Sequence, residues 1–402
     1  MTHLPLALDP YLRDWLDLLL RWLHVIAAIA WIGASFYFVL LDQSLRPPKD
    51  PADTEAGVGG ELWEVHGGGF YHVKKYRVAP PVLPDHLAWF KWEAYTTWLS
   101  GFGLMIVLYY LNAHSTLIDP AVAALQTWQA VALSVGLLAL AWVVYDVLCR
   151  LLDARELVLA AVLLVLTAVA AWGSSELFST RAAWLQVGAM LGTIMAANVF
   201  FVIIPAHWEL IRAKEAGREP DPAAGIKGKQ RSVHNNYFTL PVLLTMLAGH
   251  FAFLNGRAHA WLILVTLMVV GAAVRLFYNL RHGGRTIWAI PVAAVVVVVA
   301  LAVWLRPGDG SYAGGGAAAP TPAQIAQGKT VFATAGCGSC HTLADAGAQG
   351  NVGPNLDGAK PPFALVTERV TNGKGGMPPF RGTLDAAEIA AVAAYVSTVA
   401  GG

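Results

Sequence analysis

Eight apolar segments, separated by polar stretches, dominate the first three quarters of the chain. Each is close to the roughly 20 helical residues that cross a hydrocarbon core about 30 Å thick. Backbone groups inside a bilayer must pair within their own segment, so we expect helices. The expected spans are Leu18–Leu41, Trp92–Leu111, Thr127–Leu148, Leu157–Trp172, Ala183–Ile204, Phe238–Leu254, Ala260–Tyr278 and Ile287–Leu305.

The basic residues between these spans are distributed unevenly. Sixteen lysines and arginines fall in the loops that follow the odd-numbered spans. The loops after the second, fourth and sixth spans carry only Arg181 and Arg257. Because basic loops stay in the cytoplasm, this bias places both ends of the chain outside it.

Composition agrees with a membrane protein. The chain is 56% hydrophobic and 13% charged, with fifteen tryptophans, which is too apolar for a soluble protein of this length. A net charge of +1 without a basic stripe argues against nucleic acid as a partner. The N-terminal region has few basic residues and its first apolar run is too long for a cleavable signal peptide.

The last quarter of the chain has a different character. We predict a membrane domain over residues 1–305, a flexible Gly/Ala/Pro linker over 306–322 and a small domain over 323–402. In the small domain, Ala323–Ala335 and Asp385–Val399 are expected to be helices. The predicted fold is therefore all-α: a polytopic bundle of about eight spans followed by a small helical domain.

Cys337-Gly338-Ser339-Cys340-His341 is the attachment motif of a c-type haem. Two thiols two residues apart can form thioethers to the vinyl groups of one porphyrin, and the adjacent imidazole becomes the proximal ligand of the iron. A redox dithiol does not need the histidine. A zinc site needs a second Cys/His pair, and the only other cysteine is Cys149. The motif predicts one covalent haem c.

The second axial ligand follows by elimination, because Met377 is the only methionine after residue 310. It lies in a glycine- and proline-rich loop, Asn372–Pro379. Ligation by His341 and Met377 raises the reduction potential of a haem, so the iron should accept electrons and not activate oxygen.

This domain resembles class I cytochromes c, through the haem motif, the Gly353-Pro354-Asn355-Leu356 loop and the flanking helices. The resemblance implies that the carbonyl of Pro354 accepts a hydrogen bond from the proximal His341. It also implies that the first and last helices cross through a contact of Gly328 and Phe332 with Tyr395.

Aromatic, histidine, amide and cationic residues concentrate in the predicted cytoplasmic stretches His66–Tyr76, His86–Trp98 and Gly228–Phe238. Two interpretations stay open. The stretches form an interfacial aromatic belt with cytoplasmic lysines, or they line a pocket for a flat anionic ring, which needs stacking faces, a cation and in-plane hydrogen-bonding groups.

The first two of these stretches, Asn198–Pro205 and Gly228–Pro241 resemble the signature regions of the membrane-bound, cytochrome-c-linked urate oxidases (urate hydroxylases). The resemblance covers essentially the whole chain. It implies an enzyme of purine degradation that oxidises urate to 5-hydroxyisourate and passes electrons to its cytochrome. It also implies the bacterial inner membrane, an extracytoplasmic cytochrome, and a soluble cytochrome or terminal oxidase as acceptor.

Candidate site residues follow from the chemistry of urate, a monoanionic purine whose C5 becomes electrophilic toward water when two electrons leave. A base is needed for the water or for an N–H proton, and His234 or His72 could supply it. Candidates for stacking and hydrogen bonding are Trp89, Trp92, Tyr95, Asn235 and Asn236. Candidates for holding the anion are Lys91, Lys229 and Arg231.

Two histidines lie within the predicted spans, His24 in the first and His250 in the sixth. Either they ligate a b-type haem that relays electrons across the roughly 30 Å core, or neighbouring side chains in the bundle satisfy their hydrogen-bonding groups.

Two functions other than a urate-oxidising enzyme fit a membrane domain joined to a cytochrome less well. A membrane-anchored electron-transfer subunit needs fewer spans, and a transporter usually shows repeats, which are absent here.

Overall fold

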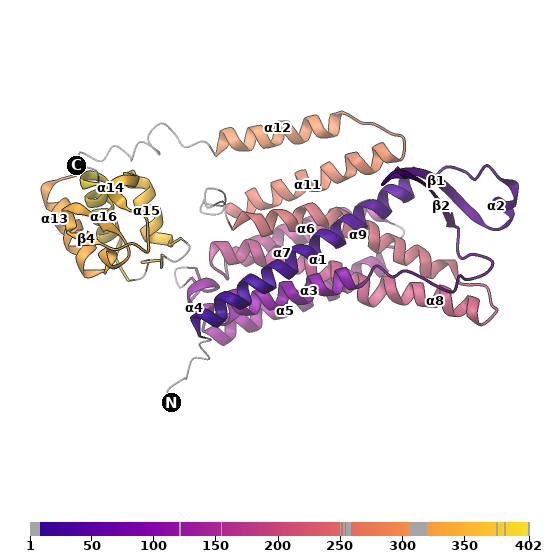
Figure 1. Ribbon diagram of the computed structural model, residues 1–402, viewed down its shortest axis with the longest axis horizontal. Helices are drawn as coiled ribbons and strands as arrows, with labels where there is room; N and C mark the ends of the chain where they lie inside the picture. The colour runs from indigo at the N-terminus through magenta and orange to yellow at the C-terminus, as the bar shows by residue number, and fades with distance from the viewer. Residues whose placement is uncertain are drawn as a thin grey trace. The chain divides into compact units, whose positions relative to one another are not determined.

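The structure is a computed structural model that describes residues 9–119, 122–153, 155–249, 251, 254, 259–305, 320–374, 377–381 and 383–400. The chain divides into two compact units, Met1–Leu301 and Ala302–Gly402. Each unit is built mainly from helices (Figure 1), so the predicted all-α class is confirmed.

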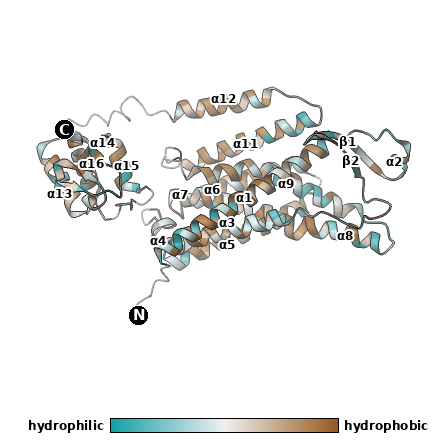
Figure 2. Ribbon diagram, in the orientation of Figure 1, coloured by the Kyte–Doolittle hydropathy of each residue, from teal (hydrophilic) through white to brown (hydrophobic). Residues whose placement is uncertain are grey.

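Five helices of the first unit are long and apolar enough to cross a membrane. They coincide with the first, third, fourth, fifth and seventh expected spans, and Figure 2 shows their hydrophobic character. The membrane-crossing segments are Tyr11–Ser44 in α1 (Pro10–Ser44), α5 (Thr127–Leu151), α6 (Glu156–Ser175), Thr180–Glu215 and α11 (Ala260–His282).

The other three expected spans also fall on helices, with different boundaries. The second is α3 (Trp92–Met105), which η1 (Ile106–Tyr110) continues as a π-helix. The sixth lies at the end of the long helix α9 (Pro222–Ala248), whose first half is polar. The eighth is the apolar helix α12 (Ala289–Trp304), which has 16 residues. Short helices α2 (Pro51–Glu55) and α4 (Ala113–Thr116) complete the unit.

The fifth span continues beyond its predicted end. Helix α7 (Thr180–Asn198) continues through a π-helical turn, η2 (Val199–Ile203), into α8 (Ile204–Glu215). Together they form one continuous helical segment of 36 residues. The turn precedes Pro205, whose ring would clash with the carbonyl four residues earlier in a regular helix. A π-turn relieves that clash and keeps the helical segment continuous.

A β-hairpin was not predicted. Strands β1 (Val58–His66) and β2 (Gly69–Tyr76) pair antiparallel, with His66 opposite Gly69. Gly67 and Gly68 connect them, with φ of 58° and 82°, as a two-residue hairpin turn of this kind requires. The Gly-Gly-Gly sequence between two alternating stretches is the signal that would have predicted it.

A second difference concerns residues 228–238, which the sequence predicts to be a cytoplasmic stretch between two spans. They lie inside α9, which begins at Pro222 after Asp221, whose carboxylate accepts from the N–H of Ala223 at 2.9 Å. Successive residues of a helix point about 100° apart. The polar residues of this stretch therefore face different neighbours.

Small residues let the helices of the bundle approach closely. At Gly188 of α7, a Cβ atom would lie 2.7 Å from Cβ of Thr245 on α9. At Gly101 of α3, it would lie 2.8 Å from the ring of His24 on α1. Helix α9 thus packs tightly on α7, and it also packs against α11, so that its polar residues Arg231, Asn235 and Asn236 are buried in the bundle.

The second unit consists of α13 (Pro322–Thr334), η3 (Cys337–Ser339), β3 (Thr342–Leu343), η4 (Ala344–Ala346), β4 (Ala348–Gln349), α14 (Leu356–Ala359), α15 (Phe363–Asn372) and α16 (Ala386–Val399). Helices α13 and α16 cross where Gly328 meets Ala391 and Tyr395. Phe332 and Tyr395 pack edge to face at 5.9 Å. The crossing expected from the sequence is confirmed.

Gly328→Ala should destabilise this unit. The added Cβ would lie 2.6 Å from Cβ of Tyr395, and neither helix backbone can move away without breaking the crossing. Overpacking of this kind costs about 1–3 kcal/mol or more. Thermal unfolding followed by haem absorbance measures the loss. Gly358→Ala is the control, because its Cβ would reach no atom closer than 4.0 Å; equal melting of the two variants would contradict the role of the crossing.

Candidate functional site

The haem motif forms a tight turn. Its residues occupy η3, and the N–H of His341 donates to the carbonyl of Cys337 at 3.0 Å. Nδ1 of His341 lies 2.9 Å from the carbonyl oxygen of Pro354, as the resemblance implied. Since a carbonyl only accepts, Nδ1 carries the proton and Nε2 is left for a metal. Gly353 lies against the same ring, where a Cβ would come within 2.5 Å.

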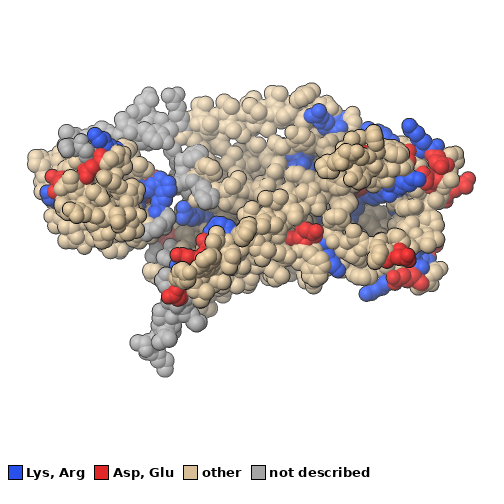
Figure 3. All heavy atoms as spheres, in the orientation of Figure 1, with Lys and Arg blue, Asp and Glu red and all other residues tan. Residues whose placement is uncertain are grey.

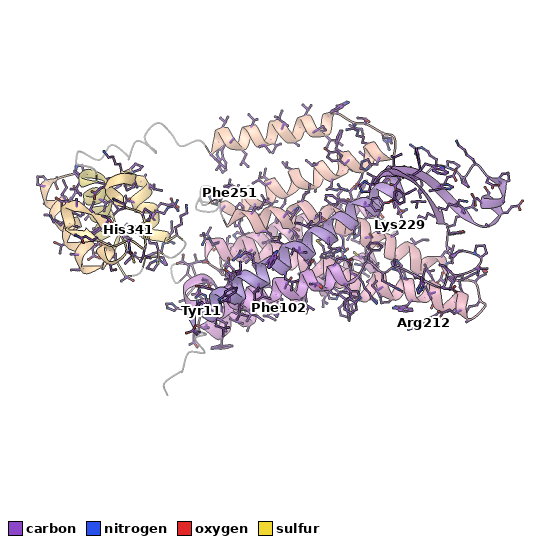
Figure 4. All side chains as sticks on the ribbon, in the orientation of Figure 1. Tyr11, Phe102, Arg212, Lys229, Phe251 and His341 are labelled. Carbon is purple, nitrogen blue, oxygen red and sulfur yellow. The ribbon has the colours of Figure 1, made fainter. Side chains whose placement is uncertain are left out.

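The loop of Met377 is held by its own backbone. Lys374 and Met377 exchange two N–H···O hydrogen bonds of 3.0 Å, and the N–H of Phe380 donates to Val370 at 2.8 Å. Gly373, with φ of 68°, fits under the carbonyl of Met377 where a Cβ would lie at 2.5 Å. Met377 packs against the core of the unit, and His341 lies among its helices (Figure 4). Two free thiols, an imidazole nitrogen and a thioether together fit a c-type haem.

Asp345 joins the haem motif region to α16. Its carboxylate accepts from the hydroxyl of Tyr395 at 2.6 Å and pairs with Lys329 at 2.9 Å. The bond from Tyr395 and then the one from Lys329 hold the pKa of Asp345 below its ordinary value. Burial and this carboxylate raise the pKa of Tyr395.

A buried polar group in the membrane unit, which we name the Tyr145 cluster, joins α5, α7 and α9. Its members are Tyr145, His234, Asn198 and Asn235. The amide of Asn198 donates to the Tyr145 hydroxyl at 3.1 Å and to Oδ1 of Asn235 at 2.9 Å. The hydroxyl lies 2.7 Å from Nδ1 of His234. The direction of this bond follows the tautomer of His234: an imidazole protonated on Nε2 accepts from the hydroxyl, and in that form Tyr145 can pass a proton to it.

A buried ion pair borders the Tyr145 cluster. Arg231 donates to Asp146 at 2.8 Å, and its guanidinium lies 4.9 Å from the ring centre of Tyr145. Asp146 also accepts from Arg150, an exposed residue, at 2.7 Å. Arg231 therefore has a carboxylate partner, although its Nη1 is buried without a hydrogen-bond partner.

A second polar group, which we name the Arg275 cluster, joins α9, α11 and α1. It contains Arg275, Asn236, Asn279 and the ring of Phe36. Oδ1 of Asn236 accepts from Nε of Arg275 at 3.1 Å, from Nη2 at 3.0 Å and from Asn279 at 3.1 Å. The three side chains other than Phe36 are all buried.

The remaining predicted residues lie in other places. His72, on the hairpin, pairs with Glu61 at 2.8 Å and stacks on Trp63 at 4.1 Å. Lys229 pairs with Asp42 at 3.5 Å, at the end of the bundle that carries the hairpin (Figure 4).

The start of α3 holds a third group of predicted residues. Nζ of Lys91 lies 4.8 Å from the ring centre of Trp89, which packs on Trp208 at 4.8 Å. Trp92 and Tyr95 are 5.9 Å apart, edge to face. Figure 3 shows charged side chains gathered over the hairpin and α8, while much of the bundle surface is uncharged.

The sequence therefore predicted His234, Asn235 and Arg231, which the structure brings together. It did not predict the residues of other helices with which they pair. It missed Tyr145, Asp146, Arg275 and Asn279. Asp146 and Arg275 each interrupt an apolar helix, and an ionisable residue within a predicted span is the signal that could have found them.

The possible haem b ligands can be followed only in part. Nδ1 of His24 lies 2.9 Å from the carbonyl oxygen of Thr97 and 3.2 Å from the hydroxyl of Ser100. His250 lies outside the described residues.

An apolar helical bundle joined to a unit with a haem attachment turn defines an oxidoreductase that transfers electrons through a cytochrome c domain. The family model described as "Urate oxidase N-terminal" matches residues 10–306. The model described as "Cytochrome C oxidase, cbb3-type, subunit III" matches residues 323–396. The chain belongs to the urate oxidase N-terminal family.

Relatives of the C-terminal domain are small cytochromes. It is 43% identical over 93 residues to cytochrome c6 of Tetradesmus obliquus and 42% identical over 91 residues to that of Chlorolobion braunii. Each alignment covers 20% of this chain and 96% of the relative. The crystal structure of the c-type cytochrome SorU from Sinorhizobium meliloti is 50% identical, covers 20% of this chain and 95% of its own, and has a TM-score of 0.20. The cofactor of this domain is haem c.

Acid should weaken the C-terminal unit through Asp345. Because its folded-state pKa lies below the unfolded value of about 3.9, its contribution to stability is full above that pH and is lost as the pH falls toward the folded pKa. Asp345→Asn should flatten this part of the pH profile, measured as thermal stability of the full-length protein by haem absorbance. Glu368→Gln, which removes a half-buried carboxylate paired with Arg369, is the control. A profile unchanged by Asp345→Asn would contradict the assignment.

Proposed function

We propose that this chain oxidises urate to 5-hydroxyisourate and passes the electrons to its own haem c. The observation that carries the proposal is the family match over residues 10–306, joined in one chain to a cytochrome c domain. In this reaction water adds its oxygen at C5 of the purine, and two electrons and two protons leave. A fused electron acceptor suits an oxidation that does not hand its electrons directly to oxygen.

We propose that Cys337 and Cys340 attach this haem and that His341 and Met377 are its axial ligands. The hydrogen bond from Nδ1 of His341 to Pro354 supports this, because it fixes the ring and leaves Nε2 for iron. A His/Met-ligated haem has a raised potential and carries one electron at a time. The two electrons of urate therefore leave in succession, and a soluble cytochrome or a terminal oxidase takes them onward.

For the proton chemistry we propose His234, acting through the hydroxyl of Tyr145. The 2.7 Å contact orients the imidazole, and Tyr145 is buried, which limits access of water to the pair. His72 is the weaker candidate, because Glu61 and Trp63 already engage its ring. Asn235 belongs to the same cluster. Asn236 lies in the Arg275 cluster, and Trp92 and Lys91 lie at the start of α3, so their part in the reaction stays a prediction.

The proposed location is the bacterial inner membrane, with the cytochrome outside the cytoplasm. The five apolar helices support a membrane protein. The excess of basic residues in alternate loops, and the attachment of haem c outside the cytoplasm, support the orientation.

Urate should reduce the haem of the protein in isolated membranes, and His234→Ala should lower the rate of reduction by about 10²-fold or more, as expected for loss of a general base. Stopped-flow absorbance under anaerobic conditions measures this. His114→Ala, which removes an exposed histidine, is the control and should behave as wild type. A dithionite-reduced spectrum equal to that of wild type shows that the variant keeps its haem.

A wild-type haem that urate does not reduce would remove the proposed reaction. The chain would then be either an oxidoreductase for another donor or a membrane-anchored electron-transfer subunit without its own substrate. Reduction by other purines would keep the enzyme and change the substrate. Wild-type reduction rates in His234→Ala would remove that residue alone.

Each chain should carry one covalent haem c. A pyridine haemochrome spectrum with protein quantification measures the ratio, and Cys337→Ala should abolish the two-thioether signal. A further b-type signal, lost in His24→Ala, would support a membrane haem held by His24. The donation of Nδ1 to Thr97 favours that role, because it leaves Nε2 free. A c-type signal alone would end the haem b hypothesis.

A further inference from the structure

The buried cations of the membrane unit differ in how their charge is balanced. Arg231 is paired with Asp146. Nearer the surface, Lys75 and Lys229 share Asp42, and Lys74 pairs with Asp53 at 2.7 Å. Arg275 takes part in none of the ion pairs formed within the described part of the chain.

Every hydrogen-bond partner of Arg275 is neutral. Nε and Nη2 donate to Asn236, and Nη2 also donates to Asn279 at 3.1 Å. The guanidinium lies 3.9 Å from the ring centre of Phe36, and the residue is only 6% exposed. Such contacts orient a cation but do not neutralise it, and an uncompensated charge in a helical bundle is costly.

Free hydrogen-bonding capacity lies beside this cation. Nη1 of Arg275 donates to no described residue. Nδ2 of Asn236 is fully buried without a partner. The orientation of this amide is determined by its neighbours, because its oxygen accepts from both Arg275 and Asn279. Buried donors without acceptors are rare in proteins and call for an explanation.

A further polar group without a partner lies on the same helix as Arg275. His282 follows Asn279 by about one helical turn, and its Nδ1 is buried without a partner. Two buried polar groups without partners, Nδ2 of Asn236 and Nδ1 of His282, thus lie on the helices that hold this cation.

We propose that Arg275, held in place by Asn236 and Asn279, binds the anionic ring of the substrate. The inference rests on the proposed function and names the residue that recognises the negative charge. A guanidinium presents paired donors in one plane, which suits a planar anion with neighbouring acceptors. The free amide of Asn236 supplies a further donor beside it.

The position of Arg275 suits a substrate that enters from the hairpin end of the bundle. It precedes the end of α11 by seven residues, which corresponds to about 10 Å. Lys229, at that end, adds to the positive potential that attracts an anion. Asn236 is two residues from His234 on α9, so the Arg275 cluster and the Tyr145 cluster lie at the same level, on different sides of this helix.

Binding can be measured without turnover, because protein whose haem is already reduced cannot accept electrons from urate. Equilibrium binding of radiolabelled urate to dithionite-reduced, detergent-purified protein should be at least about tenfold weaker in Arg275→Gln. Arg275→Lys, which keeps the charge but not the planar group, should lose less. Arg218→Gln removes an exposed arginine and is the charge-matched control.

A second variant covers the case in which Arg275→Gln does not fold. Asn279→Asp places a carboxylate 3.1 Å from the guanidinium, as a resident anion. Its melting temperature should stay close to that of wild type, because the balanced charge offsets the hydrogen bond that Nδ2 of Asn279 donates to Asn236. It should abolish urate binding, because Arg275 then has a carboxylate partner within the protein.

The outcomes separate the two proposals. Loss of binding in Arg275→Gln and Asn279→Asp, with binding retained in His234→Ala, supports the inference. Unchanged binding in Asn279→Asp, or binding lost in His234→Ala and kept in Arg275→Gln, overturns it while the proposed function stands. A wild-type protein that neither binds urate nor is reduced by it overturns both.

Discussion

The arrangement of the membrane unit depends on one constraint: a polar group within an apolar helical bundle must find its partner inside the protein. Most side chains of α1, α5, α6, α7 and α11 are apolar, and the backbone groups of these helices meet the constraint by pairing within each helix. Helix α9 meets it differently, since its buried polar residues Arg231, Asn235 and Asn236 pair with side chains of neighbouring helices. Its side chains at 231–236 therefore determine where polar chemistry can occur in this unit.

Much of the fold could be predicted from the sequence, because its main signals are local. Apolar length located the spans, and the resemblance to class I cytochromes c located the helix crossing at Gly328, Phe332 and Tyr395. The hairpin was not predicted, although residues 58–76 carry the alternation and the glycine turn that indicate one. The partners of His234 and Asn236 could not be predicted, because they come from α5 and α11, and only tertiary packing brings those helices to α9.

In the reaction proposed above, the two domains would divide the work by the number of electrons that each handles. The proposed oxidation of a purine removes two electrons and requires water and a base, which buried polar groups of the membrane unit would provide. A haem with His and Met ligands takes one electron at a time and needs no substrate site of its own. This carrier role needs a rigid ligand set, which changes little on reduction. The compact core around Phe332 and Tyr395 provides rigidity, and so do the hydrogen bonds that fix the loops of Pro354 and Met377.

The contrast between Arg231 and Arg275 shows how a site can be recognised before its ligand is seen. Both guanidinium groups are buried, Arg231 on α9 and Arg275 against Asn236 of the same helix, but within the described residues only Arg231 has a carboxylate partner. A fold selected for stability alone gains nothing by holding the second charge among amides, since an apolar residue would cost less there. Under the proposal for Arg275, binding of an anion would balance this charge and stabilise the protein. Active sites commonly depart from the rules of stable packing in this way, so the departure at Arg275 is informative.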